Sequence, residues 1–153
     1  MAGPSLNPQT LVVDASIAVW AILPVLQGKN ADAARRFVEW GEEGATLVAP
    51  AWWAAECTTA IRRAVFAKVI SDTRAHDAIS DLFALEVQLT PVDAPLCEAA
   101  LEWSSRLKQA KAYDAFYVAL AHRLGCELWT ADERLANAAA QAKLKSVHWV
   151  GES

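Results

Sequence analysis

The stretch Leu11-Val12-Val13-Asp14 decides the fold class. Its three apolar residues, two of them β-branched, do not alternate with polar residues as they would in a half-exposed strand. Such a run is typical of a strand buried on both faces, in a parallel sheet that is covered by helices on each side. Because the run ends on a carboxylate, we expect Asp14 at the carboxyl end of this strand, at the edge of the sheet.

Strand and helix patterns alternate along the rest of the chain. Further short strands are expected at 46–49, 87–89, 127–130 and 147–150. Helical segments are expected up to residue 23, at 30–44, at 52–65, from 71, from 93, at 113–124 and from 132. Asn30, Asp93 and Asp132 are the expected N-caps, and Gly44 and Gly125 the expected terminators. This order predicts an α/β fold, a three-layer α/β/α sandwich with a mainly parallel central sheet of about five short strands.

The composition fits one globular domain over residues 1–153. Of these residues 54% are hydrophobic, and 14 basic against 18 acidic side chains give a net charge of −4. Disorder is excluded, because apolar residues are too plentiful and the net charge is too small. The longest apolar stretch, from Ile17 to Leu26, is interrupted by Pro24 and is too short to cross a bilayer, and residues 1–10 show no signal-peptide pattern. We therefore expect a cytoplasmic protein without a membrane segment.

Cysteine and histidine side chains do not suggest a site. Cys57, Cys97 and Cys126 are widely spaced and form no CxxC pair, so they are interpreted as small buried apolar residues. The three histidines lack any ligand spacing, which removes histidine-based metal and nucleophile sites. The acidic balance argues against a protein that coats nucleic acid through bulk charge, but not against an enzyme that binds a few phosphates locally.

Four acids stand among apolar or small neighbours instead of in charged runs, and they are Asp14, Glu56, Asp114 and Asp132. Helical spacing places Glu56 on one face with Trp52, Trp53 and Ala60, and Asp114 on one face with Tyr117, Val118 and Ala121. A carboxylate on such a face is costly unless a charged or hydrogen-bonding group meets it. Each acid alone has a structural alternative: Asp132 is a plausible helix cap, and Lys111 is placed to pair with Asp114.

Taken together, the four acids predict a cation site. Carboxylates gathered at one edge of a sheet repel each other unless a divalent ion lies between them. Oxygen ligands without histidine or cysteine favour Mg²⁺ or Mn²⁺, and these ions suit hydrolysis of a phosphodiester. Removing the four acids leaves 18 − 4 = 14 acids against 14 bases, so the excess negative charge equals the expected site.

The sequence resembles the PIN-domain ribonucleases, and most closely the toxins of VapBC toxin–antitoxin systems. The motifs that carry the resemblance are Leu11-Val-Val-Asp14-Ala-Ser16, Ala55-Glu56, Tyr113-Asp114-Ala-Phe-Tyr-Val-Ala-Leu-Ala121 and Leu128-Trp-Thr130-Ala-Asp132-Glu-Arg-Leu135. The resemblance implies RNA cleavage that depends on Mg²⁺ or Mn²⁺, with the four acids as catalytic and metal-binding residues. It also implies that the hydroxyls of Ser16 and Thr130 orient the acids or a metal-bound water, that a VapB-like antitoxin binds the chain, and that the chain forms a homodimer.

Residues near the acids are candidates for RNA contacts. Arg62, Arg63 and Lys111 are candidates for phosphate contacts, and Trp52, Trp53 and Tyr113 are candidates for stacking on unpaired bases. The alternative is that the basic residues belong to solvated helix faces and the tryptophans to the core or to a subunit interface. The helical segments 32–40 and 51–65 are candidates for contacts with an antitoxin or a second subunit.

Other functions remain open at this stage. A PIN domain also serves in RNA maturation or decay, and a catalytically inactive PIN module would only bind protein or RNA. A phosphoryl-accepting receiver is disfavoured, because it needs adjacent acids after the first strand and a lysine after the last. A haloacid-dehalogenase-type phosphatase is disfavoured because its motif needs a second aspartate where this chain has Ser16.

Overall fold

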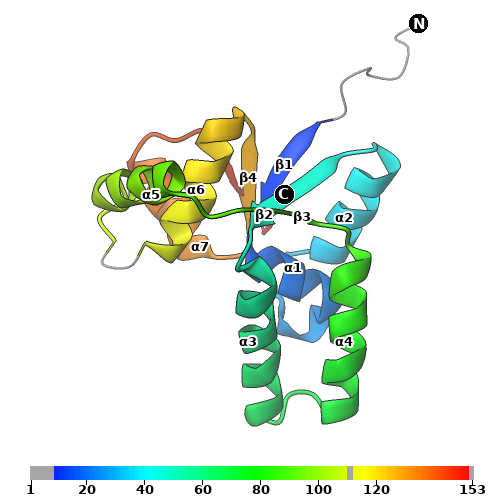
Figure 1. Ribbon diagram of the computed structural model, residues 1–153. Helices are drawn as coiled ribbons and strands as arrows, with labels where there is room; N and C mark the ends of the chain where they lie inside the picture. The colour runs from blue at the N-terminus through cyan, green and yellow to red at the C-terminus, as the bar shows by residue number, and fades with distance from the viewer. Residues whose placement is uncertain (1–8, 110–111, 152–153) are drawn as a thin grey trace, which may run out of the picture.

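The computed structural model describes residues 9–109 and 112–151, and a five-stranded sheet lies at its centre (Figure 1). The strands are β1 (Thr10–Val13), β2 (Thr46–Pro50), β3 (Gln88–Thr90), β4 (Glu127–Thr130) and β5 (Val147–Trp149). They lie in the order β3-β2-β1-β4-β5, and every neighbouring pair is parallel. The expected parallel sheet of five short strands is confirmed.

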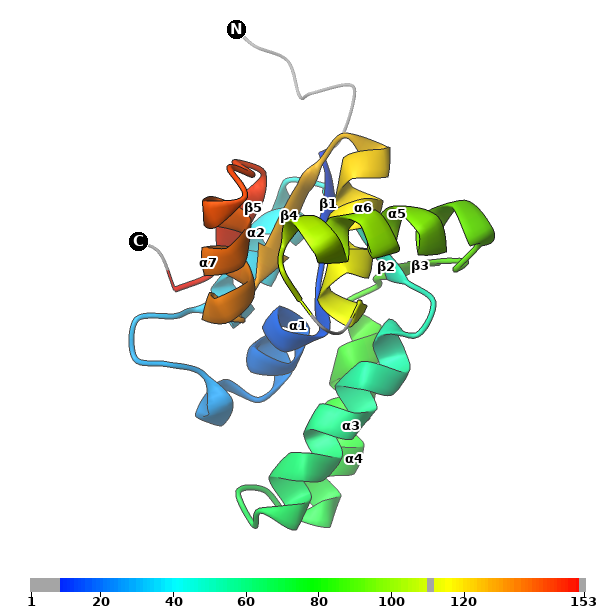
Figure 2. The same ribbon diagram turned by 90° about the vertical axis from the view of Figure 1, so that its left-hand side faces the viewer.

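Helices cover both faces of this sheet. They are α1 (Ala15–Ile22), α2 (Ala33–Glu42), α3 (Trp53–Phe66), α4 (Asp72–Ala84), α5 (Ala94–Arg106), α6 (Tyr113–Leu124) and α7 (Glu133–Gln141), with a 3-10 turn η1 (Pro24–Leu26) after α1. Figure 1 shows α5, α6 and α7 on one side of the sheet and α2 on the other. Helices α3 and α4 form a hairpin that extends away from the sheet, as the turned view in Figure 2 also shows. The three-layer α/β/α prediction is therefore confirmed.

The strand order reverses at β1. From β1 the chain proceeds to β2 and β3 on one side, and later to β4 and β5 on the other. In register, Leu11 pairs with both Leu47 and Glu127, so β1 lies between β2 and β4. Parallel sheets bind ligands beyond the carboxyl ends of the strands at such a reversal. This edge of β1 and β4 is therefore the first place to look for a site.

Several element boundaries differ from those expected. Helix α2 is capped by Asp32, whose side chain accepts a hydrogen bond from Arg35 N, so the expected cap at Asn30 is wrong. Strand β3 begins at Gln88, one residue later than expected. Gly44 follows α2 with φ +71°, a left-handed conformation that glycine adopts without strain. These differences shift the ends of the elements but leave the order of strands and helices as expected.

The core lies between the sheet and its two helical layers. Leu11, Val12 and Val13 of β1 are fully buried, in agreement with the apolar run that suggested a central strand. Cys57 is buried but Cys97 is exposed and Cys126 half-buried, so burial of all three cysteines was a wrong expectation. Among the described residues, no helix is long and apolar enough to cross a membrane.

Candidate active site

Asp14 lies at the carboxyl end of β1 and is also the N-cap of α1. Its Oδ1 accepts hydrogen bonds from the Ser16 hydroxyl at 2.6 Å and from Ile17 N at 3.1 Å. Its Oδ2 accepts a hydrogen bond from the Thr130 hydroxyl at 2.5 Å. The Asp14 side chain is thus fixed by both neighbouring elements, α1 and the end of β4.

The two hydroxyls are themselves held by backbone groups beyond β4. Ala131 N donates to the Ser16 hydroxyl oxygen and Asp132 N donates to the Thr130 hydroxyl oxygen, both at 2.9 Å. Since these oxygens accept from the backbone, their own protons are directed toward Asp14. The expectation that Ser16 and Thr130 orient an acid therefore has a geometric basis at Asp14.

Burial raises the pKa of Asp14 to about 7, although the hydrogen bonds from Ser16, Thr130 and Ile17 oppose the shift. The negative charge of Glu56 raises this pKa further. A buried carboxylate that accepts three hydrogen bonds but has no positive partner remains poorly compensated. The negative charge of Asp14 is therefore only partly compensated by the described residues.

Glu56 is half-buried in the first turns of α3, and its partner comes from α6. The hydroxyl of Tyr117 donates to Glu56 Oε2 at 2.7 Å. Burial raises the pKa of Glu56, the Tyr117 hydrogen bond lowers it, and the charge of Asp114 raises it again. Tyr117 is only 1% exposed, and a buried tyrosine hydroxyl usually has a hydrogen-bond partner, which here is the Glu56 carboxylate.

Replacing Tyr117 with phenylalanine is expected to reduce metal-dependent RNA cleavage by about 10- to 100-fold, as losing a group that orients a site carboxylate commonly does. The ring keeps its place in the core, and only the donor to Glu56 is lost. The effect is measured as kcat and KM on a defined RNA, with Ser104→Ala as the control. Ser104 is another buried hydroxyl, but it donates to Ala100 O within α5, away from the acids. An unchanged rate in Tyr117→Phe would rule out this positioning role.

Asp114 and Asp132 join Asp14 and Glu56 in a group of four acids, which we call the acidic row. Asp114 lies in the first turn of α6, where burial raises its pKa and the charge of Asp132 raises it further, while Arg134 opposes the shift. Asp132 is the N-cap of α7, where its Oδ1 accepts a hydrogen bond from Arg134 N at 3.0 Å. Asp132 thus has the capping role that was considered for it, and its charge also acts on Asp114.

Four helices begin at this edge of the sheet with an acid at or near their first residue. Asp14 and Asp132 cap α1 and α7, and Glu56 and Asp114 lie in the first turns of α3 and α6. The positive ends of the helix dipoles favour these negative charges. Dipoles compensate only part of the charge, which the raised pKa values of Asp14, Glu56 and Asp114 show.

Side-chain cations do not neutralise the row within residues 9–109 and 112–151. The ion pairs found there include Arg134 with Asp132, but none that involves Asp14, Glu56 or Asp114. No three acidic, histidine or cysteine side chains of those residues converge closely enough to form a complete metal cage. One or two carboxylates and several waters are the usual ligands of Mg²⁺. Asp14, Glu56 and Asp114, oxygen ligands without an ion-pair partner among the described residues, fit that ion.

Only some of the residues that were candidates for RNA contacts lie at the four acids in the structure. Arg63 lines a hollow of about 650 Å³ that also reaches Ser16, Glu56, Trp52 and Tyr113. Arg62 does not line this hollow; it lines a shallow depression with Phe66, which Arg63 also borders. Trp53 is buried in the core, as the alternative interpretation had it, so it is not a stacking residue. Lys111 lies outside the described residues.

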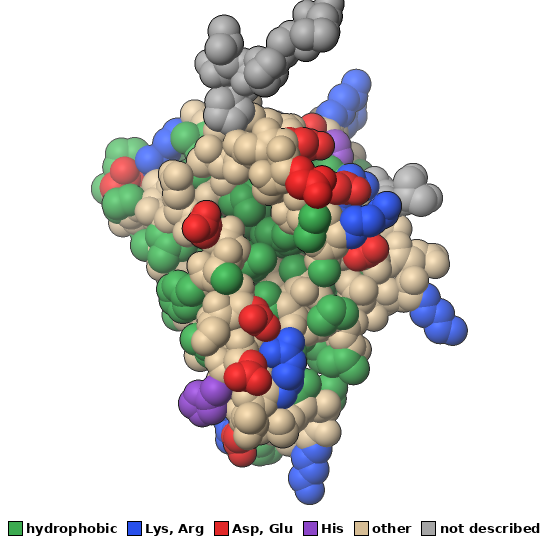
Figure 3. Space-filling view, turned by 90° about the vertical axis from the view of Figure 1, so that its right-hand side faces the viewer, with side chains coloured by type: hydrophobic (Ala, Val, Ile, Leu, Met, Phe, Trp, Pro, Cys, Tyr) green, Lys and Arg blue, Asp and Glu red, His purple; other side chains and the backbone are tan. Residues whose placement is uncertain are grey.

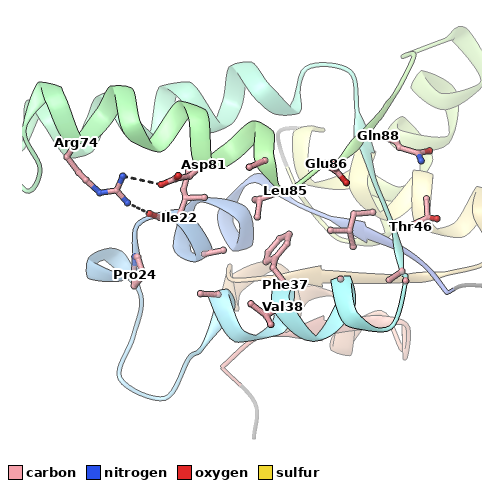
Figure 4. Close-up of a pocket in the computed structure, with 17 residues that line it drawn as sticks. Ile22, Pro24, Phe37, Val38, Thr46, Arg74, Asp81, Leu85, Glu86 and Gln88 are labelled. Atoms are coloured by element: carbon pink, nitrogen blue, oxygen red, sulfur yellow. Dashed lines mark hydrogen bonds and ion pairs between the residues drawn. The ribbon is translucent and has the colours of Figure 1, made fainter.

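A second hollow, of about 810 Å³, lies at the other end of α1, where Ala21 and Ile22 line it, and none of the four acids borders it. Figure 3 shows this face, where hydrophobic side chains line the hollow between α2 and α4. Phe37 and Val38 of α2 and Leu85 after α4 lie around it, and Arg74 closes one end through bonds to Asp81 and to Ile22 O (Figure 4). The expected contact segment 32–40 thus contributes to an apolar surface.

Two residues near the site were missed by the sequence analysis as site residues. Tyr117 was placed on the face of Asp114, but its bond to Glu56 depends on the approach of α6 to α3. Arg134 is almost fully exposed at the start of α7 and lowers the pKa of Asp114. Its position two residues after Asp132 was the available signal, although spacing alone does not distinguish it from other exposed arginines.

Comparison with known proteins agrees with this geometry. A family model described as the PIN domain matches residues 11–141. The chain therefore belongs to the PIN domain family.

The curated relatives and solved structures add detail. "Ribonuclease VapC12" of Mycobacterium tuberculosis, from strains CDC 1551 / Oshkosh and ATCC 25618 / H37Rv, is 37% identical over 126 residues, which are 82% of this chain and 89% of that protein. Within the family, the chain is thus akin to the VapC ribonucleases.

Two solved structures share the fold. The crystal structure of M. tuberculosis VapC20, described as a sarcin-ricin loop cleaving toxin, has a TM-score of 0.58 at 22% identity, over 84% of this chain and 94% of that one. PAE2754 from Pyrobaculum aerophilum has a TM-score of 0.60 at 19% identity, over 97% of this chain and 93% of that one. At these identities the likeness concerns the fold.

Proposed function

We propose that this chain is a VapC-type toxin, an endoribonuclease that hydrolyses RNA phosphodiester bonds with Mg²⁺ or Mn²⁺. Membership of the PIN family and the likeness to a VapC ribonuclease support this activity. The observation that carries the proposal is the row of three carboxylates whose pKa values are raised by burial, at the strand-order reversal, with no cation of the described residues paired to them.

In this proposal Asp14 and Asp114 hold one ion, and Glu56 and Asp132 lie where they would complete its surroundings or hold a second. When bound, a divalent ion stabilises negative charge on the phosphoryl oxygens and makes a water molecule a better nucleophile. Ser16 and Thr130 keep Asp14 in one orientation. Because Asp14 Oδ2 accepts only the Thr130 hydrogen bond among the described residues, it keeps a lone pair for the ion.

A side-chain nucleophile is not part of this mechanism. Cys57 is adjacent to Glu56 in sequence, but burial and the charges of Glu56 and Asp14 raise the pKa of its thiol. The thiol therefore stays protonated at neutral pH, and a protonated thiol is a poor nucleophile. The attacking group is instead a water molecule, and the Tyr117 hydroxyl fixes the orientation of Glu56.

Purified protein incubated with total RNA is expected to produce discrete new 5′ ends in Mg²⁺ or Mn²⁺ and none in the presence of a chelator. The ends are mapped by sequencing of the RNA. Cleavage that persists in the chelator, or RNA that stays intact with both ions, would contradict the proposed activity. Restored cleavage on adding the ion back to the chelated protein is the control for irreversible loss of the fold.

Two protein partners belong to the same proposal. A VapB-like antitoxin would cover apolar surface on α2, where Val38 is 60% exposed at the hollow between α2 and α4. A second copy of the chain would cover the end of the α3–α4 hairpin, where Phe66 is 79% and Val69 47% exposed. Light scattering during size-exclusion chromatography would then give the mass of a dimer, and a monomer at high concentration would contradict the second contact.

The remaining expectations concern the whole molecule. We propose that residues 1–153 act as one nuclease domain, since the family match spans most of the chain. We also propose that the protein acts in the cytoplasm, where both RNA and an antitoxin are present.

A further inference from the structure

The α3–α4 hairpin carries one of the four acids, although most of it lies away from the sheet. Glu56 lies in the first turn of α3, and from there the hairpin extends outward (Figure 2). Helix α1 begins directly after Asp14 and packs against both helices of the hairpin. The position of Glu56 relative to Asp14 therefore depends on how the hairpin lies on α1.

Two polar contacts attach the hairpin to α1, one at each end of that helix. Near the start of α1, the Cys57 thiol lies 3.9 Å from Ala15 O, and a thiol is only a weak donor. At the other end, Arg74 Nη2 donates to Ile22 O at 2.6 Å. Because a charged donor makes the stronger hydrogen bond, Arg74 is the main polar attachment of the two.

The side chain of Arg74 is held in place by its own helix. Its Nη1 donates to Asp81 Oδ2 at 3.3 Å, two turns farther along α4 (Figure 4). Its backbone N donates to the hydroxyl of Ser71, the N-cap of α4, at 3.0 Å. Ile22 O belongs to the last turn of α1, where carbonyls lack partners within the helix and a positive charge is favoured. Arg74 therefore caps α1 from a neighbouring element.

Charge repulsion at the other end of α1 acts against this attachment. The negative charge of Glu56 raises the pKa of Asp14, so the two carboxylates are close enough to affect each other. Like charges at this distance favour a larger separation of α3 from the start of α1. A strong contact between the hairpin and α1 opposes that separation.

We propose that Arg74 is a positioning residue for the metal site, which keeps Glu56 beside an ion at Asp14 by holding the hairpin on α1. The inference rests on the proposed function. Arg74 lies at the far end of α1 from Asp14, and a helix of eight residues is about 12 Å long. Without Arg74 the hairpin tilts and displaces Glu56, while Ser16 and Thr130 keep Asp14 in place.

Mn²⁺ binding to the full-length protein, measured by electron paramagnetic resonance, tests this role. Arg74→Ala is expected to weaken binding roughly 2- to 30-fold, the range for a residue that acts on a distant site through the elements between them. Arg74→Lys keeps a donor for Ile22 O but loses the fork that also reaches Asp81, so it should lose less affinity. The control is Arg35→Ala, which removes an exposed, ion-paired arginine from α2 and should bind like the unsubstituted protein.

The same comparison in a Glu56→Gln protein separates positioning from a general loss of stability. Asp14 and Asp114 remain there, so weaker Mn²⁺ binding is expected to persist. Adding Arg74→Ala should then cost no further affinity, because the carboxylate that Arg74 positions is gone. A general effect on the fold would lower the affinity in both backgrounds. Urea unfolding in chelator checks that each variant is folded, and Arg74→Lys replaces Arg74→Ala if the alanine variant does not fold.

Equal Mn²⁺ affinity of the Arg74→Ala and Arg35→Ala proteins would overturn the inference. So would an equal loss of affinity with and without Glu56, or a complete loss of Mn²⁺ in Glu56→Gln alone, since the inference requires an ion at Asp14 that Glu56 only supports. Failure of the proposed function gives a different result, in which the unsubstituted protein neither binds Mn²⁺ nor cleaves RNA in its presence.

Discussion

Replacing Asp14 with asparagine is expected to lower divalent-dependent RNA cleavage by roughly 100- to 1000-fold, the loss typical of removing one group that stabilises charge in a transition state. The substitution keeps the size of the side chain and its ability to cap α1, since asparagine is as good an N-cap as aspartate. It removes the negative charge that lies between the Ser16 and Thr130 hydroxyls. Single-turnover cleavage of a defined RNA in Mn²⁺ measures the loss.

The control for this substitution is Asp77→Asn, which removes an exposed acid from α4, outside the row. It should cleave RNA at the unsubstituted rate. A cleavage rate of Asp14→Asn within a few-fold of the unsubstituted rate would show that the reaction does not use the carboxylate at the end of β1.

The same asparagine is expected to stabilise the metal-free protein above neutral pH by about 2–4 kcal/mol. Burial raises the pKa of Asp14 from 3.8 in its ordinary state to about 7 in the folded protein. Between these values the folded protein holds a proton that the unfolded chain has lost, so stability falls as the pH rises from about 4 to about 7. Asparagine has no proton to lose and removes this decline.

Urea unfolding of both proteins in chelator, at a series of pH values, measures this difference. The advantage of Asp14→Asn should be absent near pH 4, grow through neutral pH and level off near pH 8. Comparing the two proteins cancels the contribution of other acids, such as Asp93, whose pKa is lowered by Arg123. A difference that is independent of pH, or that favours aspartate at pH 8, would contradict the burial of an uncompensated charge.

The Asp14 carboxylate is thus expected to be needed for RNA cleavage and, at the same time, to lower the stability of the metal-free protein. A buried acid that destabilises the fold is a common property of functional sites, because its chemistry requires an environment that its charge does not favour. A divalent ion held by Asp14 would compensate this charge and would favour the deprotonated carboxylate at neutral pH.

Much of the site could be predicted because it depends on chain order. The apolar run before Asp14 and the segment ending at Thr130 indicated two buried parallel strands, and the carboxyl ends of such strands lie at one edge of the sheet. Asp14 and Thr130 consequently meet through a hydrogen bond, although 116 residues separate them. Helical periodicity likewise predicted that Glu56 and Asp114 lie on the buried faces of their helices.

Other features depend on how the elements pack, and sequence spacing does not encode that. The Tyr117 hydroxyl reaches Glu56 only because α6 lies against the start of α3. Arg62 and Arg63 are neighbours in sequence, but only Arg63 turns toward the hollow at the acids. Asn30 and Asp32 are both good capping residues, and the structure uses the one whose side chain meets Arg35 N. Trp53 was a candidate for RNA stacking, but it is 2% exposed in the core.

The most direct test of the central claim is Mn²⁺ binding measured by electron paramagnetic resonance, because it reports on the acidic row without RNA. The unsubstituted protein is expected to bind Mn²⁺, and Asp14→Asn to bind it at least about 10-fold more weakly, while Asp77→Asn binds it normally. If the unsubstituted protein binds no Mn²⁺, or if Asp14→Asn binds it with unchanged affinity, then the carboxylates at the ends of β1 and β4 are not a divalent-cation site.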